Sequence, residues 1–330
     1  MRRLSELFAA EDRMHLTEDG FVIEGYHPPR RALRVNILAM GDVGGTLALA
    51  LRLTGADIVR SIGICDLDDK VCARYEMELN QIAMPDDPAA FPPVEVISKE
   101  ALFDGDVFLF CATRGVPPVE ASAEKTGKDV RMAQLEGNLK LIAGFAEQAA
   151  ACGYRGDFFV VSDPVDPLCK QAILCGLDPG QVKGFGLGVM HARAAYYAAK
   201  DPVFAIYLRE GRAFGPHGQD LVIADSIRSY DDANALALTQ QTVNTNLAIR
   251  ALGFKPYLAP ACSSGALSLL EDMRGHWHYS SAYFGEGNRG AFLGMRCRRT
   301  EDGLLVENLP LDERLFARIE RAYRNLEALV

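Results

Sequence analysis

The chain has 330 residues, with 44 acidic and 35 basic side chains and a net charge of −9 at pH 7. This length is enough for two domains of ordinary size, and the acidic balance disfavours binding to nucleic acid or to an anionic membrane. The sequence has neither an apolar run long enough for a membrane span nor the pattern of a secretory signal, so we expect a cytoplasmic protein. The eight cysteines form no Cys-x-x-Cys pair, so we expect free thiols and no metal.

The first 32 residues precede the first predicted strand of the main fold. Leu4, Leu7 and Phe8 have the spacing of a short amphipathic helix, and Phe21–Ile23 is predicted to form a small edge strand. This N-terminal extension carries no group with evident chemistry. We therefore expect it to contribute packing or subunit contacts.

A glycine turn between a strand and a helix is the first chemical motif of the chain. The predicted strand Val35–Met40 is followed by Gly41 and Gly44, and an apolar helix comes next. Glycines let the backbone approach a pyrophosphate, and the N-terminus of a helix attracts its negative charge. The usual first glycine of this pattern is Ala39 here, so the alternative interpretation is an ordinary strand-to-helix turn.

An acid at the end of the next strand supports a nucleotide site. Asp66 directly follows the predicted strand Ile62–Cys65. A carboxylate at this place can accept both ribose hydroxyls of NAD, and it would repel the 2′-phosphate of NADP. Residues 33–166 are therefore predicted to form a dinucleotide-binding Rossmann domain that takes NAD.

The rest of this predicted domain alternates strands and helices. Strands are predicted at Val94–Ile97, Val107–Ala112 and Phe158–Ser162, and a long helix is predicted from Val130 to Cys152. Such alternation is typical of an α/β fold with a parallel, doubly wound sheet. The polar segment 113–129 follows the end of a strand, where ligands bind in such sheets, so it is interpreted as a lid or binding loop.

Residues 167–330 are predicted to form an α+β substrate domain. Its predicted elements are antiparallel strands at Val203–Arg209 and Leu221–Ile227, helices at Ala233–Leu252, 265–273 and Leu311–Leu329, and a hairpin at 290–308. The basic run Arg296–Arg299 is too short for a nucleic-acid patch. We interpret this run as the exposed end of a strand.

Three positions suit acid–base or anion-binding chemistry. His217 lies on a turn between Gly215 and Gly218, where its ring can reach a cleft, although a histidine on a loop is often only a surface residue. Arg193 has apolar neighbours in a predicted helix and could be a salt-bridge partner or an anion clamp. Arg131 opens the long helix beside the predicted lid, and its alternative role is that of a solvated helix-start residue.

The order of these motifs resembles the L-lactate/malate dehydrogenase family from about Val35 to Leu329. The segments that carry the resemblance are Gly41-Asp42-Val43-Gly44, Cys65-Asp66, Phe110–Arg114, Arg131–Asn138, Val161–Asp166, Gly186–Arg193 and Gly215–Gly218. The resemblance implies an NAD-binding Rossmann domain followed by a substrate domain. It also implies hydride transfer between the nicotinamide and a small 2-hydroxy or 2-oxo carboxylic acid, and a homodimer or homotetramer.

The resemblance further implies a role for each candidate residue. His217 would be the general acid and base, and Arg193 would bind the substrate carboxylate through a bidentate pair. Arg131 would polarise the reacting carbonyl as the lid closes. The residues implied to lie at the cofactor are Gly41, Asp42, Val43, Gly44, Asp66, Ala112, Asn138 and Ser162.

Two residues depart from the family at the reacting centre. The aspartate that orients the catalytic histidine in the family stands three residues before the carboxylate-binding arginine, and this position is Met190 here. Where the family has asparagine in the Ser-x-Pro-Val-Asp segment, this chain has Asp163. We therefore expect Asp163 to replace the missing acid and to pair with His217. The alternative is that the substrate is not a simple 2-oxo acid.

Two other functions stay open at this point. The loop between Arg114 and Arg131 looks longer than the loop of the family, which favours a larger substrate such as an imino acid. The substitutions at Met190 and Asp163 favour a protein that binds NAD(H) as a sensor or subunit without efficient turnover.

Overall fold

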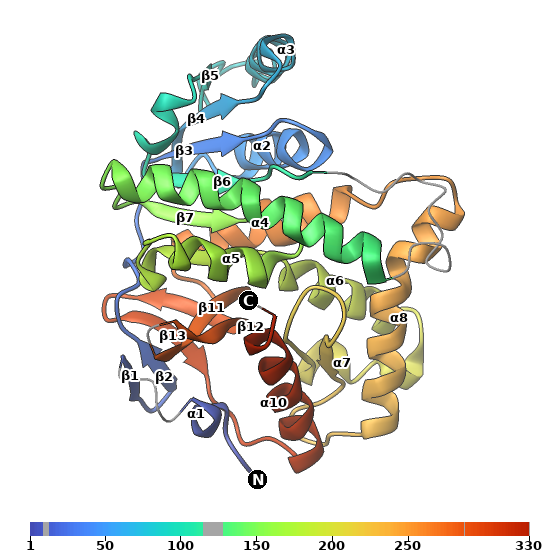
Figure 1. Cartoon of the computed structure of the whole chain (residues 1–330). Coiled ribbons are helices and arrows are strands. Elements are labelled where there is room, and N and C mark those ends of the chain that lie inside the picture. The colour runs from blue at the N-terminus through green and yellow to red at the C-terminus, as the bar shows by residue number, and fades with distance from the viewer. Residues whose placement is uncertain (9–12, 115–127, 287, 330) are drawn as a thin grey trace.

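The computed structural model describes residues 1–8, 13–114, 128–286 and 288–329, with the backbone alone for residues 128–134. One mixed sheet of eleven strands runs through the molecule, in the order β1-β2-β13-β12-β11-β8-β7-β6-β3-β4-β5, with helices on both of its faces (Figure 1). Within the described ranges, no helix combines the length and apolar character that a membrane span requires.

The strands at one end of this sheet form a doubly wound parallel unit. They are β5 (Val94–Val96), β4 (Val59–Cys65), β3 (Leu33–Leu38), β6 (Val107–Phe110), β7 (Asp157–Val160) and β8 (Val182–Gly184). Every neighbouring pair among them is parallel. Counted along the chain, their spatial order is the 3-2-1-4-5-6 order of a dinucleotide-binding sheet. The predicted fold class is confirmed.

Helices bury both faces of the parallel strands. One face packs against α2 (Asp42–Thr54), the π-helix η4 (Pro260–Leu267) and α9 (Ser268–Arg274). The other face packs against α4 (Lys128–Ala151) and α5 (Val165–Leu174). The buried side chains of the strands divide between these two clusters because successive residues of a strand point to opposite faces.

The remaining strands of the large sheet are antiparallel and include the N-terminal extension. They are β11 (His278–Glu286), β12 (Arg289–Thr300), β13 (Gly303–Glu307), β2 (Gly20–Ile23) and β1 (Met14–Leu16). A single register pair, Ser281 with Gly184, joins β11 to the parallel unit. The predicted C-terminal hairpin is confirmed by β12 and β13.

Two helices cover one face of this antiparallel part. They are α10 (Glu313–Glu327) and α1 (Leu4–Leu7). Phe8, just after α1, stacks on Phe284 of β11 with ring centroids 3.8 Å apart. Residues of the extension are therefore part of a hydrophobic core, which confirms the packing role expected for them.

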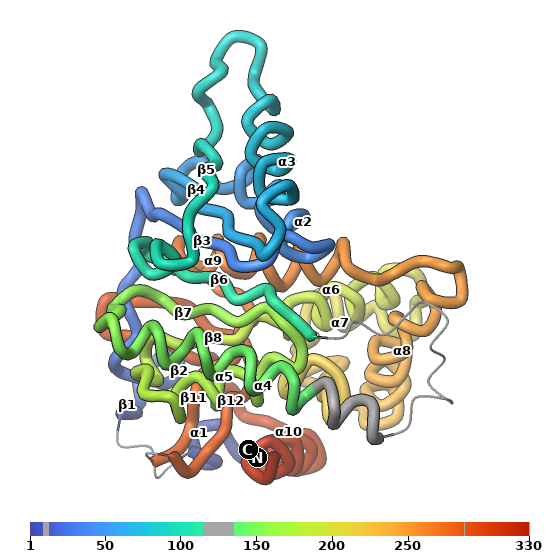
Figure 2. Tube along the Cα trace, turned by 45° about the horizontal axis from the view of Figure 1, so that its top comes forward, coloured from blue at the N-terminus to red at the C-terminus, as the bar shows by residue number. Residues whose placement is uncertain are grey.

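A further cluster lies beside the antiparallel strands. It joins α6 (Leu187–Ala198) and α8 (Asp232–Ala251) to the two-stranded sheet of β9 (Arg212–Phe214) and β10 (Val222–Ala224). The other helices are α3 (Asp69–Asn80), α7 (Tyr207–Glu210) and the 3-10 turns η1 (Glu100–Phe103), η2 (Pro179–Gln181) and η3 (Pro202–Phe204). The segment from α3 to β5 projects from one end of the molecule (Figure 2).

One predicted strand is wrong. Val203–Arg209 forms η3 and α7, and the strand of this region begins only at Arg212. The side chain of Asp201 accepts a hydrogen bond from the Val203 amide, and Pro202 occupies the first helical position. These are helix-start residues, and they outweigh the β-branched and aromatic residues on which the strand prediction relied. β8 and β11 were not predicted.

The interpretation of Arg296–Arg299 as an exposed strand end is also wrong. Arg299 is buried near the end of β12, where its Nη2 lies 3.2 Å from Asp157 Oδ1 and its Nε donates to Asp272 Oδ2 at 2.8 Å. Lys183 forms a buried ion pair with Asp272, and Arg30 of the extension donates to Asp157 at 2.5 Å. Burial alone would raise the pKa of Asp157, but the charges of Arg299 and Arg30 hold it below its ordinary value. This cluster joins the extension to both parts of the sheet.

Replacing Arg299 by methionine tests the importance of this cluster. The variant leaves Asp157 and Asp272 buried with too few cations, so we expect the free energy of unfolding to fall by about 3–5 kcal/mol. Arg298→Met is the matched control, because the Arg298 side chain is 35% exposed and its ion pair with Asp19 is long, at 3.9 Å. We expect it to cost less than about 1 kcal/mol. Urea denaturation of both variants measures the difference, and equal losses would contradict this account.

Candidate active site

A cavity of about 430 Å³ opens at the carboxyl ends of the parallel strands. Described residues that directly follow β3, β4, β6, β7 and β8 line it, namely Ala39, Asp66, Cys111, Val161 and Phe185. The second half of the chain contributes His217 from the turn after β9 and Asn246 from α8. Ligands of doubly wound sheets bind at this edge, close to the point where the strand order reverses between β3 and β6.

The glycine turn forms one wall of the cavity. Gly41 caps the N-terminus of α2, and a Cβ placed on it would meet no atom within 4 Å. Gly44 has no such space, because a Cβ there would lie 1.9 Å from the carbonyl oxygen of Ala39. Ala39 itself has a φ of 73°, in the left-handed region that favours glycine. The backbone thus has the conformation of the glycine pattern even where the first glycine is missing.

The acid after β4 lies in the same cavity. Asp66 is half-buried, and its Oδ2 accepts a hydrogen bond from the Met40 amide at 2.7 Å. Its Oδ1 accepts one from the Asp68 amide at 3.1 Å. Each carboxylate oxygen can accept a further bond, so the side chain is held in place and keeps acceptors for a ligand. Asp42 and Val43 also line the cavity, and Asp42 pairs with Lys255 at 3.3 Å.

His217 and Asp163 form the hydrogen-bonded pair that was expected. His217 Nδ1 lies 2.8 Å from Asp163 Oδ1, and both residues line the cavity. The side chain of His217 is 10% exposed, whereas that of Asp163 is 59% exposed. A carboxylate is an acceptor only, so Nδ1 carries the hydrogen of this bond and Nε2 is the remaining ring nitrogen.

Arg193 is buried within α6 and is not among the described residues that line the cavity, although its partner Asn246 is. Its guanidinium donates to Asn246 Oδ1 at 2.6 Å and contacts Met190 Sδ at 3.5 Å. Within the described chain, its buried Nε has no hydrogen-bond partner. Burial lowers the pKa of Arg193, and the charge of Asp163 acts in the opposite direction. Asp163 therefore bonds to the imidazole, and its charge also acts on the pKa of the guanidinium.

His191, the residue after Met190, lies in a different environment. Its Nδ1 is 2.8 Å from the Tyr207 hydroxyl, and its ring packs against Tyr279. Burial, with the charges of Arg212 and Arg296, lowers the pKa of His191 to about 4. His191 is thus a neutral residue of the cluster around α6 and does not line the described cavity.

Asn138 holds the two strand ends behind the cavity. Its Nδ2 donates to the Asp163 carbonyl at 2.8 Å and to Thr113 Oγ1 at 3.1 Å, and its Oδ1 accepts from the Arg114 amide at 2.7 Å. Asn138 is fully buried, and its amide is occupied by these bonds. It is outside the described cavity lining, as is Ala112, while Ser162 and Thr113 belong to that lining.

The predicted lid cannot be placed relative to these residues. Segment 115–127 lies outside the described residues. Arg131 lies in α4, but its side chain is also outside the described part of the chain. Its proposed role therefore stays a prediction.

Several residues of the cavity were not found from the sequence. Asn246 and Arg250 both line it, four residues apart on α8, and Lys255 and Tyr257 follow from the next segment. The i, i+4 spacing of Asn246 and Arg250 places them on one face of the helix. That spacing was a usable signal, but nothing in the sequence showed which face meets the cavity.

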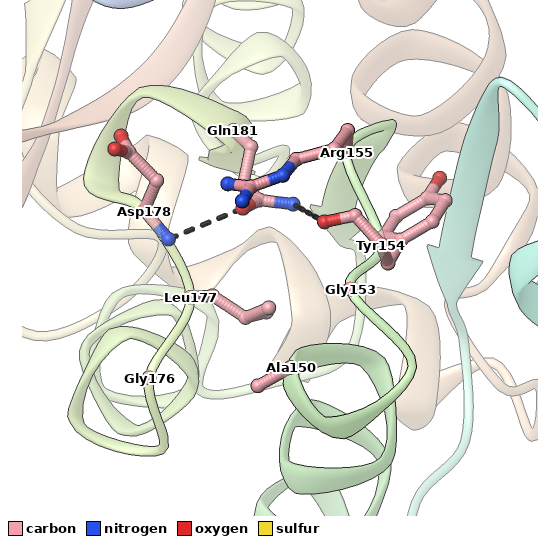
Figure 3. A pocket seen from close by; sticks show the side chains of 8 residues that line it. All are labelled: Ala150, Gly153, Tyr154, Arg155, Gly176, Leu177, Asp178 and Gln181. Atoms are coloured by element: carbon pink, nitrogen blue, oxygen red, sulfur yellow. Dashed lines mark hydrogen bonds between the residues drawn. The ribbon is translucent and has the colours of Figure 1, made fainter.

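A second cavity, of about 320 Å³, lies at the opposite edge of the parallel strands (Figure 3). It is formed around the segments that precede β7 and β8, and Gln181 and Asp178 are among its lining residues. The Gln181 amide donates to the carbonyls of Tyr154 and Gly156 and accepts from the Asp178 amide. Because these bonds occupy the amide, and because no predicted site residue lies here, the first cavity is the candidate active site.

Part of the chain is similar in sequence to L-lactate dehydrogenases. The chain is 28% identical over 200 residues to the L-lactate dehydrogenase of Treponema denticola, and 28% identical over 188 residues to that of Staphylococcus saprophyticus. These alignments cover 59% and 56% of this chain but only 58% and 54% of the two enzymes. The chain thus spans little more than half the length of the curated relatives it matches. It matches no protein-family profile.

Solved structures share the fold over nearly the whole chain. Malate dehydrogenase of Cryptosporidium parvum superposes with a TM-score of 0.71 at 18% identity, covering 91% of this chain and 98% of that one. A lactate dehydrogenase from a Medee basin deep-sea metagenome superposes with a TM-score of 0.69 at 20% identity, covering 90% and 97%. Malate dehydrogenase of Archaeoglobus fulgidus in complex with NADH has a TM-score of 0.71 at 16% identity, covering 89% and 97%. The chain thus has the fold of lactate and malate dehydrogenases, and part of its sequence is similar to L-lactate dehydrogenases.

Proposed function

We propose that the protein is an NAD-dependent dehydrogenase that interconverts a small 2-hydroxy acid and the corresponding 2-oxo acid. The observation that carries this proposal is the hydrogen bond between His217 and Asp163, in the cavity that also holds the glycine turn and Asp66. The division into an extension, a cofactor domain ending near residue 166 and a substrate domain is part of the proposal. So are a cytoplasmic location and a homodimer or homotetramer.

The residues of the cofactor wall fit NAD(H). The open space at Gly41 lets the backbone approach a diphosphate, whose charge the N-terminus of α2 attracts. Asp66 offers carboxylate acceptors to the ribose hydroxyls and would repel a 2′-phosphate. When bound, the nicotinamide would supply or accept the hydride. The residues of the chain would bind the carboxylic acid substrate, orient it and transfer one proton.

His217 is the proposed general acid and base. Its Nδ1 is engaged by Asp163, so Nε2 is the nitrogen that would face the substrate oxygen. In reduction it would donate a proton to the carbonyl oxygen, and in oxidation it would remove the hydroxyl proton. Asp163 fixes the tautomer and the ring orientation, which is the task of the acid in other histidine-based sites. The same bond gives the negative charge of Asp163 a partner, which reduces its repulsion of an anionic substrate.

Arg193 is the proposed carboxylate clamp. Its buried Nε, which lacks a partner among the described residues, would be satisfied by a substrate carboxylate. Asn246 holds the guanidinium at 2.6 Å and lines the cavity, which gives the planar group a fixed orientation. We propose that Arg131, carried by α4, polarises the carbonyl from the lid side, and its test is the loss of turnover in an Arg131 variant.

Two substitutions test the acid–base pair. His217→Ala should lower turnover of a 2-oxo acid with NADH at least ~10³-fold, and Asp163→Asn should lower it about 10²–10⁴-fold because the neutral amide permits the wrong tautomer. Both variants should bind NADH with nearly unchanged affinity. The oxidation of NADH, followed by absorbance over a panel of 2-oxo acids, measures turnover.

Asp104→Asn is the matched control for the loss of a carboxylate. Asp104 is exposed and precedes β6, at the opposite edge of the parallel strands, so its substitution should leave turnover unchanged. Full activity of the His217 variant would contradict the proposed acid–base role. Tight NADH binding by the parent protein without turnover of any 2-oxo acid or imine would instead support a binding protein.

Asp66→Ala tests the proposed ribose contact. Loss of a hydrogen bond between a charged group and the ribose is worth about 1.5–3 kcal/mol, so the Kd for NADH should rise about 10–100-fold. Asp69→Ala is the control, since Asp69 is exposed in the first turn of α3. Fluorescence titration with NADH compares the variants, and unchanged affinity in Asp66→Ala would refute the assignment.

The two glycines of the turn should respond differently to alanine. Gly44→Ala forces a Cβ onto the Ala39 carbonyl oxygen, so we expect a loss of several kcal/mol in unfolding free energy. Gly41→Ala meets open space and should change the unfolding free energy by less than about 1 kcal/mol. Its methyl group would stand where the diphosphate is proposed to lie, so NADH affinity should fall. Thermal unfolding and NADH titration separate the two effects, and equal stability of both variants would contradict the geometry.

A further inference from the structure

A cation from the second half of the chain contacts the glycine turn at the cavity. Lys255 lies in the segment between α8 and η4, and its Nζ is 3.3 Å from Oδ2 of Asp42 in the first turn of α2. Both residues line the cavity, although 213 positions separate them in the sequence. Neither side chain has a task in the proposed acid–base or carboxylate-binding steps.

The ion pair between these two residues is weak by itself. The side chains of Lys255 and Asp42 are 49% and 50% exposed, and an exposed pair at this distance adds little to stability. A lysine ammonium carries three hydrogens, and the contact with Asp42 Oδ2 engages one of them. Lys255 therefore keeps donors that can bind a second anion without giving up the first.

The charges around the cavity show where such an anion would be accepted. Three acids are among the described residues that line it, and two of them have other hydrogen-bond partners: Asp163 contacts the imidazole, and Asp66 accepts from two backbone amides. The arginine and lysine of the described lining are Arg250, half-buried on α8, and Lys255. The third acid, Asp42, is thus the one whose charge a lysine balances.

The position of Asp42 creates a need for this balance. Asp42 is the first residue of α2, directly after Gly41, where a Cβ would meet no atom within 4 Å. A diphosphate in that open space would bring negative charge next to the Asp42 carboxylate, and like charges at short range repel each other. The N-terminus of α2 carries only a partial positive charge to offset this repulsion. A full cation between the carboxylate and the diphosphate would attract both.

We propose that Lys255 binds the diphosphate of the dinucleotide, and that Asp42 is a positioning residue that holds the Lys255 ammonium at the cavity. The ammonium would donate one hydrogen to Asp42 and another to a phosphate oxygen. The second half of the chain then contributes a ligand to the cofactor as well as to the substrate. This inference rests on the proposed function, because it takes the cofactor to be NAD(H), but it concerns binding and is independent of turnover.

Lys255→Met tests the inference by the kind of ligand that it affects. The Kd for NADH and for ADP should rise about tenfold, because a charge-assisted hydrogen bond to phosphate is lost and the Asp42 charge is left unbalanced. The Kd for adenosine, which has no phosphate, should change less than about twofold. Isothermal titration calorimetry measures all three ligands.

Two further variants serve as controls. Lys255→Arg keeps a cation that binds phosphate, so its Kd for ADP should stay within about threefold of that of the parent protein. Lys140→Met removes a lysine that is exposed on α4 and is outside the described cavity lining. This second control should leave the Kd for all three ligands unchanged.

Asp42→Asn tests the positioning role through a double-mutant comparison. In the Asp42→Asn background, Lys255→Met should raise the Kd for ADP only about threefold, because the ammonium is no longer held in place and no unbalanced acid remains. A loss as large as in the parent protein would show that the two residues act independently, which would contradict the positioning role. The Kd for adenosine should be the same in both backgrounds.

The outcomes separate this inference from the proposed function. Unchanged Kd values for NADH and ADP in Lys255→Met overturn the inference, even if the protein reduces a 2-oxo acid. An equal loss for adenosine, or an equal loss in Lys140→Met, also overturns it, because the effect would not be specific to the diphosphate or to Lys255. A selective loss in a protein that turns over no substrate refutes the dehydrogenase and supports the inference. A parent protein that binds neither NADH nor ADP overturns both.

Discussion

The parallel strands of a doubly wound sheet all end at one edge, and the candidate site depends on this constraint. The constraint brings Ala39, Asp66, Cys111 and Asp163 together, although more than a hundred residues separate the first from the last. The hydrogen bond from Asp163 to His217 then ties this edge to the second half of the chain. The residues proposed for cofactor binding and for proton transfer thus line one cavity because strand pairing brings them together.

The carboxylate that contacts His217 belongs to the segment after β7 and does not lie on α6. The resemblance implies an aspartate three residues before Arg193, whereas α6 has Met190 at that position. The backbone of Asp163 is held in place because Asn138 Nδ2 donates to its carbonyl at 2.8 Å. The anchored backbone holds an exposed side chain within reach of His217.

Short sequence motifs predicted those features of the site that depend on neighbouring residues in the chain. The glycine turn and Asp66 could be predicted because each depends on a short motif. The Asp163–His217 pair could be predicted because Met190 replaces an expected acid and Asp163 adds a carboxylate. The strand predicted at Val203–Arg209 failed because Asp201 and Pro202 start a helical turn there. The burial of Arg299 and Asp166 could not be predicted, because partners from distant elements determine it.

The pairing of β2 with β13 has a consequence for the association of the protein. Without β2, the edge of β13 would present a row of unsatisfied amides and carbonyls above a hydrophobic face. Such an edge can pair with the same edge of another molecule. β1 is then the outermost strand of the sheet, with only three residues and an exposed end. The extension thus leaves a shorter unpaired strand edge than β13 would present without it. By pairing with β13, β2 therefore covers an edge through which two copies of the sheet could otherwise pair.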